Sequence, residues 1–478
     1  MIPKYRSGSR DCSAARTDVA EKGPVLWRND NRDRTLIRRV AIDVLRIATA
    51  AGLAQILALI AVPFLTRLYN PEVFGHFAIF SALVTVLMPL ASLRYEVALP
   101  LPSEEPIALD LLAFCLLLVV GSSLAIALLC PLIGLSLAEL TSITGTEIML
   151  LPMATFAIGL HAVMTSWLVR DRAFSRVARI RFATTVGTLA CQLGLAELYP
   201  SSTGLILGFI GGYLVGFILA AYHCQHVLLA AAARIRVSGI RYVAAEYRSF
   251  AIITAPSGII NALGSQLPSM VLPWLYGLAV TGQYSLAQRV LWQPLVFVGQ
   301  AVYQVFWGNA ARLFVDEPAR LWPLFRHLNI CLLAAMAPAL LLSWFGAEIF
   351  AFVFGPAWEQ AGRFAGALVL ASFVGLAAQA TTTLEIYRLN HWMSAYELMR
   401  LILIIGALSA ASWMAFSPMT CVIVITAAFA ICNLTLFGLN AIAIWRVTLR
   451  AERRDQRTAT TIAIPPKTVS FASENTER

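Results

Sequence analysis

Apolar segments about as long as a membrane is thick recur along the whole chain. A bilayer core about 30 Å thick is crossed by about 20 apolar residues in an α-helix. Such segments lie near residues 44–65, 73–93, 109–130, 147–169, 178–199, 204–226, 250–274, 285–307, 327–350, 362–386, 395–416 and 420–445. Only 13% of the residues are charged, against about 25% in ordinary globular domains. The sequence therefore predicts an all-α polytopic membrane protein with twelve transmembrane helices.

The arginines between these segments alternate from one side of the predicted membrane to the other. Cytoplasmic loops of membrane proteins carry an excess of Lys and Arg. With a cytoplasmic N-terminus, the loops on that side hold most loop arginines, among them Arg94, Arg241 and Arg400, whereas the other side holds Arg67 and Arg363. This predicts a multi-pass protein with both termini in the cytoplasm. The net charge of +10 thus has a topological explanation, and we expect no nucleic-acid partner.

A short pattern occurs twice, with an offset of 207 residues between the copies. The residues of the first copy are Leu68, Tyr69, Val73, Gly75 and Phe77, and those of the second are Leu275, Tyr276, Val280, Gly282 and Tyr284. Each copy lies between the first and second segments of a set of six, so the halves share one orientation. We therefore predict two pseudo-symmetric six-helix bundles.

The bundles and the remaining segments divide the chain into five parts. The predicted parts are a disordered cytoplasmic tail at 1–43, a bundle at 44–226, a cytoplasmic linker at 227–249, a bundle at 250–445 and a disordered cytoplasmic tail at 446–478. The linker combines arginines with apolar residues, as a helix lying on the membrane surface would. Topological charge alone explains the same pattern.

Four motifs, in order along the chain, resemble those of bacterial polysaccharide-export flippases. They read LTRLYNPEVFGHFAIF (65–80), LRYEVALPLPSEEPIALDLL (93–112), GQYSLAQRVLWQPL (282–295) and VFGPAWEQAG (353–362). This family holds the Wzx-type oligosaccharide flippases, in the superfamily that includes multidrug and toxin extrusion transporters. The resemblance implies an inner-membrane transporter that moves undecaprenyl-diphosphate-linked repeat units of lipopolysaccharide O-antigen or exopolysaccharide to the periplasmic leaflet. It also implies membrane lipid as a partner, with a polysaccharide polymerase and a chain-length regulator as further candidates.

Such a cargo needs a cationic, polar cavity between the bundles, because it carries a diphosphate and a glycan. The segment 285–307 places Arg289, Gln293, Gln300 and Gln304 within 60° of one another at 100° per residue. We expect Arg289 to pair with diphosphate oxygens and the glutamines to bind sugar hydroxyls. The alternative is that these side chains join neighbouring helices by hydrogen bonds.

Three further residues are weaker candidates for contact with the cargo. Asn261 lies at helical spacing with Ser257 and Ser265, a pattern that also suits close helix packing. Arg46 and Arg94 lie at cytoplasmic ends of predicted spans. Either could attract the diphosphate from the cytoplasm, although arginines at such ends commonly anchor the helix at the interface.

Ion coupling needs a titratable group within the membrane, and His161 and Glu385 are the candidates. The alternatives are a hydrogen-bonded packing role for His161 and an interfacial position for Glu385. We predict no metal site, no cofactor and no enzymatic activity, since no nucleophile–base pair or P-loop motif stands out. The alternative functions are an ion-coupled multidrug or small-cation extruder, which should carry acidic residues deep in its spans, and a membrane-embedded glycan polymerase or transferase, which the short external loops disfavour.

Overall fold

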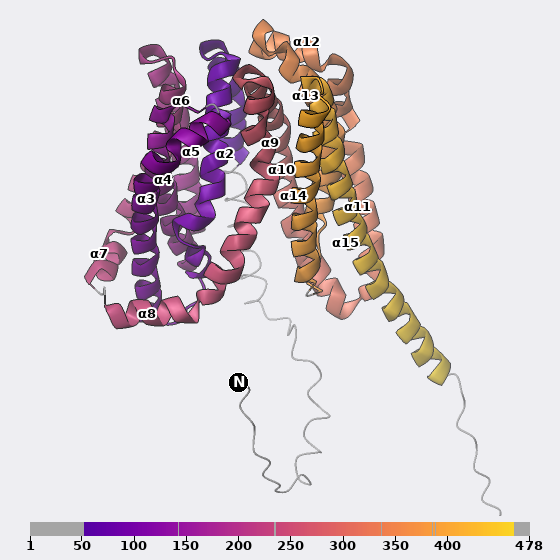
Figure 1. Cartoon of the computed structure of the whole chain (residues 1–478). Helices are drawn as coiled ribbons and strands as arrows, with labels where there is room; N and C mark the ends of the chain where they lie inside the picture. Colours follow the sequence, from indigo (N-terminus) through magenta and orange to yellow (C-terminus); the bar gives the residue numbers. More distant parts are fainter. Residues whose placement is uncertain are drawn as a thin grey trace, which may run out of the picture.

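The computed structural model describes residues 52–141, 143–233, 236–335, 337–384, 386–387 and 389–462 (Figure 1). Within these ranges the regular structure is helical throughout, with no strand. The all-α prediction is therefore confirmed. Arg46, Glu385 and the predicted tail at 1–43 lie outside the described residues.

The helices follow the predicted order. The first half contains Gly52–Leu68, α2 (Pro71–Ala91), α3 (Glu105–Thr141), α4 (Gly145–Arg170), α5 (Phe174–Leu198) and α6 (Ser202–His223). The predicted linker holds α7 (Gln225–Ala233) and α8 (Val237–Glu246). The second half contains α9 (Ala255–Tyr276), α10 (Leu278–Asp316), α11 (Leu321–Ala335), α12 (Leu342–Phe354), α13 (Glu359–Ala380), α14 (Asn390–Trp413) and α15 (Pro418–Ile462).

Over the described residues, every predicted span overlaps one of these helices, or the pair α11 and α12. Among the described residues, eight helices are long and apolar enough to cross a membrane, and the pair, bent by 45°, adds a ninth. Three predicted spans fall outside that group. The helix Gly52–Leu68 is short over its described part, α5 carries Arg176, Arg179 and Arg181, and α10 carries Arg289 and several glutamines.

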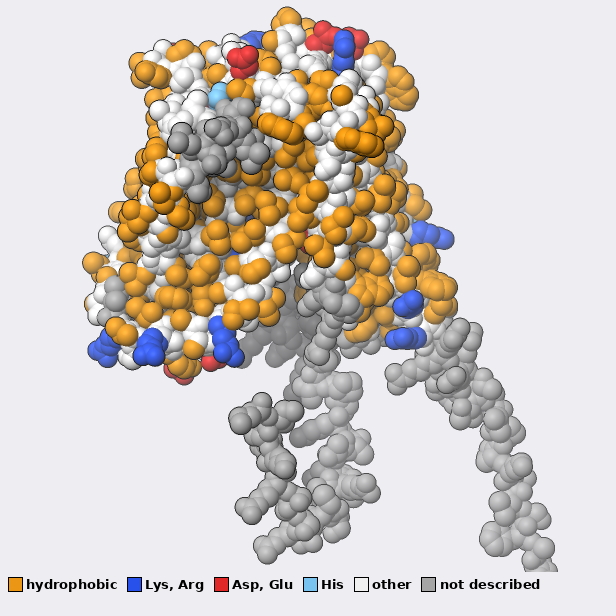
Figure 2. All heavy atoms as spheres, viewed as in Figure 1, with side chains coloured by type: hydrophobic (Ala, Val, Ile, Leu, Met, Phe, Trp, Pro, Cys, Tyr) orange, Lys and Arg blue, Asp and Glu red, His pale blue; other side chains and the backbone are white. Residues whose placement is uncertain are grey.

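The two ends of the molecule differ in their surface. The α8 end, defined by α7 and α8, lies opposite the α12 end, defined by α12 and the turn Pro356–Trp358 (Figure 1). Hydrophobic side chains cover the surface between the ends, and basic side chains gather at the α8 end (Figure 2). This distribution is that of a multi-pass membrane protein, with its apolar belt facing lipid.

The last helix is longer than predicted. α15 continues to Ile462, into the segment 446–478 that was expected to be disordered, so that expectation is wrong over 446–462. Residues 446–462 contain five arginines and two alanines, which have high helix propensity. Extending an existing helix also avoids the cost of nucleation.

Local sequence explains where α2 and α10 begin. The Asn70 side chain accepts a hydrogen bond from the backbone nitrogen of Val73 at 3.0 Å, and Pro71 occupies the first turn of α2. Both are favoured at a helix N-terminus. At the equivalent position 207 residues later, Gly277 has φ +83° and separates α9 from α10, a conformation that glycine adopts without strain.

The glycines of the repeat join the two halves at the α12 end. A Cβ atom on Gly75 would overlap the carbonyl of Leu278, and one on Gly282 would overlap the carbonyl of Pro71. Leu278 and Gly282 lie 207 residues after Pro71 and Gly75, so each contact is the repeat counterpart of the other. The repeated residues therefore form a reciprocal backbone contact between α2 and α10.

A tryptophan from the second half strengthens this junction. The buried Trp358 donates its indole N–H to the backbone carbonyl of Thr66 at 3.0 Å, and its ring meets that of Phe74 edge to face, with centroids 5.0 Å apart. Both partners belong to the first half. Three kinds of contact thus close the α12 end between the halves: the backbone contact of α2 and α10, the Trp358 hydrogen bond, and the packing of the Trp358 and Phe74 rings.

We predict that Gly282→Ala destabilises the protein, because its new methyl group would force α10 away from α2. Overpacking of this kind costs about 1–3 kcal/mol. Thermal unfolding of the purified protein in detergent measures the effect. Gly121→Ala on α3 is the matched control, since a Cβ there meets nothing within 4 Å. Equal melting temperatures for the two variants would contradict the tight contact.

Candidate substrate cavity

A cavity of about 540 Å³ lies where α2 of the first half meets α9, α10, α13, α14 and α15 of the second. The sequence candidates Arg289, Gln293 and Asn261 all line it. Its other polar lining residues are Ser81, Ser265, Gln266, Ser269, Tyr284, Ser285, Gln288, Ser372, Gln379, Tyr396, Glu397, Arg400 and Asn433. The helices thus bring polar groups that are distant in sequence to one space inside the apolar belt.

Arg289 carries an unmatched positive charge into this cavity. Its guanidinium carbon lies 5.3 Å from the centroid of the Phe77 ring on α2, a cation–π contact between the halves. It forms no ion pair or hydrogen bond with any of the described residues. A cation within a membrane normally faces a cavity or a counter-ion because its burial is costly. Arg289 is therefore available to an anionic ligand.

A second basic side chain in the cavity already has its counter-ion. Arg400 forms an ion pair with the buried Glu397 one turn earlier on α14 and donates a hydrogen bond to the backbone carbonyl of Asn261 at 2.9 Å. The Asn261 side-chain nitrogen donates to the other Glu397 oxygen at 2.7 Å. These bonds neutralise Arg400 and connect α14 to α9. The three charged lining residues leave one net positive charge, at Arg289.

This ion pair was not predicted from the sequence, and Arg400 was placed wrongly. Arg400 was assigned to a cytoplasmic loop, whereas α14 begins at Asn390 and carries both Glu397 and Arg400 within the helix. The available signal was their spacing of three residues, which places an acid and a base on one helix face. The predicted span at 395–416 already contained both residues, so the error was to count Arg400 with the loop before it.

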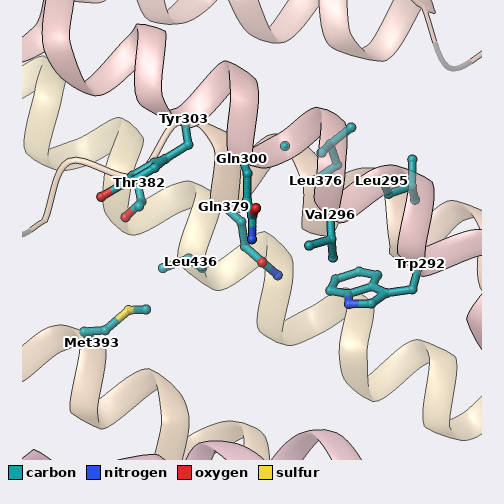
Figure 3. A pocket seen from close by; sticks show the side chains of 11 residues that line it. Trp292, Leu295, Val296, Gln300, Tyr303, Leu376, Gln379, Thr382, Met393 and Leu436 are labelled. Carbon is teal, nitrogen blue, oxygen red and sulfur yellow. The ribbon is translucent and has the colours of Figure 1, made fainter. Parts of the chain in front are cut away.

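A smaller cavity of about 310 Å³ adjoins the first and shares Trp292, Gln379 and Met393 with it. Gln300 and Gln379 project into it together, between Trp292 and Tyr303 (Figure 3). Thr382 adds a hydroxyl group. Amides, a hydroxyl group and aromatic rings around one space can hydrogen-bond to hydroxyls and cover apolar ring faces.

The predicted stripe on α10 is thus divided. Arg289 and Gln293 line the larger cavity and Gln300 lines the smaller one, whereas Gln304 is exposed and lines neither. Gln293 also accepts a hydrogen bond from the Gln55 side-chain nitrogen at 3.2 Å, so it joins helices as well as lining the cavity.

The other candidates lie apart from these cavities. Arg94 is 3.7 Å from the Glu96 carboxylate near the end of α2. His161 contacts the Thr184 hydroxyl at 3.2 Å and packs edge to face on Tyr213. His161 therefore packs between α4, α5 and α6, as its alternative role predicted.

Comparison with known proteins gives the family. The sequence model of a family described as polysaccharide biosynthesis protein matches residues 64–363. The chain belongs to this family. The matched range contains all four motifs on which the resemblance to polysaccharide-export flippases rests, and that resemblance is confirmed. No curated protein matches the chain significantly.

Solved transporters share the fold. A structure of the lipid II flippase MurJ in an inward closed conformation superposes with a TM-score of 0.63 at 14% identity, covering 88% of this chain and 94% of that one. An inward-facing multidrug resistance MATE family transporter of the MOP superfamily gives 0.54 at 12% identity, covering 84% and 95%. An outward-facing one gives 0.55 at 14% identity, covering 85% and 96%. The chain thus shares the fold of these membrane transporters.

We predict that Glu397 and Arg400 are energetically coupled. Replacing one partner of a buried ion pair is strongly destabilising, by about 3–5 kcal/mol, because it leaves the other charge unmatched. We therefore expect Glu397→Gln and Arg400→Gln each to lower the melting temperature, and the double variant to lose less than the sum. Unfolding of the four proteins in detergent gives the coupling, and additive losses would contradict the ion pair.

Proposed function

We propose that this protein is a flippase that moves a lipid-linked oligosaccharide from the cytoplasmic to the periplasmic leaflet of the inner membrane. The observation that carries the proposal is the unmatched Arg289 in a polar cavity between the halves. A diphosphate linker has two negative charges, which a guanidinium binds through charge-assisted hydrogen bonds. The family and fold independently support a membrane flippase.

The two adjoining cavities suit different parts of such a cargo. The larger one offers Arg289 to the diphosphate, and the smaller one offers the Gln300 and Gln379 amides beside Trp292 to sugar hydroxyls and ring faces. In this proposal the undecaprenyl tail stays in the lipid while the polar head crosses. The resulting glycan is O-antigen or exopolysaccharide, and a polymerase and a chain-length regulator are the expected partners.

In the proposed cycle the cavity opens first to one side of the membrane and then to the other, and the junction at the α12 end closes it on one side. The basic side chains at the α8 end favour a cytoplasmic position for that end and for both termini. Release on the other side then requires the contact of Gly75 and Gly282, and the Trp358 hydrogen bond, to open. The steps involve binding and rearrangement of the halves, with no covalent chemistry.

Extrusion of a small organic cation is the second candidate, and Glu397 is the observation that favours it. A carboxylate in the cavity could exchange a cationic drug for protons or sodium ions. However, Arg400 and Asn261 already bind both oxygens of Glu397. The free charge in the cavity is that of Arg289, which repels a cation and favours the flippase.

We predict that Arg289→Ala strongly reduces transport without loss of folding. Loss of a hydrogen bond to a charged group costs about 1.5–3 kcal/mol, or roughly tenfold to a hundredfold in binding. The measurement is leaflet-resolved quantification of lipid-linked oligosaccharide in a deletion strain that expresses each variant. Cargo should accumulate in the cytoplasmic leaflet with Arg289→Ala, and less with Arg289→Lys.

Arg326→Ala is the control, since this arginine is exposed on α11 and lines neither cavity. It should transport like the wild type. Wild-type transport by a folded Arg289→Ala protein would contradict the role of Arg289. Normal surface polysaccharide in the deletion strain itself would contradict the flippase.

A further inference from the structure

A separate polar cavity of about 630 Å³ lies in the second half, at the α12 end. Its walls come from α10, α12, the start of α13 and the start of α15. None of its lining residues lines either cavity described above. Acidic and basic side chains lie side by side at this end of the surface (Figure 2). In the proposed orientation, this cavity faces the compartment that receives the cargo.

Close backbone contacts fix the walls of this outer cavity. Gly346 on α12 and Gly362 on α13 face each other, and a Cβ on either would overlap the carbonyl of the other. One turn later, a Cβ on Gly366 would lie 2.7 Å from the carbonyl oxygen of Leu342 on α12. Gly355 turns the chain between the helices with φ +108°. The space is therefore built into the packing of α12 on α13.

A buried amide oxygen in the outer cavity lacks a hydrogen-bond donor. Gln283 is only 9% exposed, and its side-chain nitrogen donates to the carbonyl of Ala357 at 3.1 Å. Its side-chain oxygen is buried with no partner among the described residues. Buried polar atoms without partners are rare and costly. A ligand hydroxyl would supply the missing donor only if this amide turned toward the outer cavity, which Gln283 lines.

The charged side chains that line the outer cavity, one acidic and one basic, sum to zero net charge. Glu359 and Arg363 form an ion pair of 2.5 Å in the lining, and Gln360 contributes a second amide. Together these groups donate and accept hydrogen bonds without net charge, which favours a neutral ligand over an ion. Trp344, also in the lining, is 73% exposed and offers an open aromatic face.

We propose that the outer cavity is a saccharide-binding site, separate from the cavity that binds the anionic head. A pyranose has hydroxyls that donate and accept at its rim and C–H groups on its faces. The amides and the ion pair can hydrogen-bond to the hydroxyls at the rim, and the Trp344 ring can stack on the C–H groups of one sugar face. Sugar binding itself stands on this geometry alone, whereas its role in receiving the glycan of the cargo rests on the proposed function.

The test uses the full-length protein in phosphatidylethanolamine–phosphatidylglycerol nanodiscs. Saturation-transfer NMR with maltotriose and chitotriose as probes measures binding. We expect at least one probe to bind, and Trp344→Ala and Gln360→Ala each to weaken it about fivefold or more. Phe352→Ala is the matched control, because Phe352 lies on the same helix, is 87% exposed and is outside the cavity. It should leave binding unchanged.

The outcomes separate this inference from the proposed function. An Arg289→Ala protein that still binds the probe supports the outer cavity even if it transports nothing, and binding by a wild type that fails to transport overturns only the flippase. Absence of binding to the wild type, or saturation transfer confined to lipid protons, overturns the outer site. Equal binding by the Trp344→Ala and Phe352→Ala proteins overturns it as well, and so does loss of binding in Arg289→Ala.

Discussion

A guanidinium group inside the apolar belt, with no counter-ion among the described residues, is the constraint around which the second half is arranged. The Arg289 charge cannot face lipid without a large penalty, and the aromatic face of Phe77 compensates it only in part. The polar side chains of α9, α10 and α13 supply a polar space around it. In the proposed flippase, the anion that satisfies this charge is the diphosphate of the cargo.

The neighbouring ion pair makes this interpretation specific. Arg400 lines the same cavity, but Glu397 and Asn261 hold it on α14 and α9. One arginine is therefore part of the scaffold, and the other is free to bind. Two free arginines would hold a diphosphate more tightly, and tight binding would slow release on the other side of the membrane.

The hydrophobic length of the segments predicted the helix order well, because the thickness of the bilayer sets that length. The repeat also identified a real contact, since Gly75 and Gly282 are where the halves touch. The site was only partly predictable. Helical periodicity grouped Arg289 with the glutamines, but it could not tell that Gln304 is exposed, or that Glu397 and Arg400 meet Asn261 from another helix. Those facts depend on packing between segments distant in sequence.

In the proposed flippase, Arg289 binds the cargo in the polar cavity, and the junction at the α12 end opens to release it. Reconstitution of the purified protein into proteoliposomes, with undecaprenyl-diphosphate-linked oligosaccharide in both leaflets, tests this proposal most directly. A glycosidase added outside removes the glycan of the outer leaflet. If the protein is a flippase, vesicles that contain it should also lose the glycan of the inner leaflet over time. Persistent protection of the inner pool, equal to that in protein-free vesicles, would contradict it.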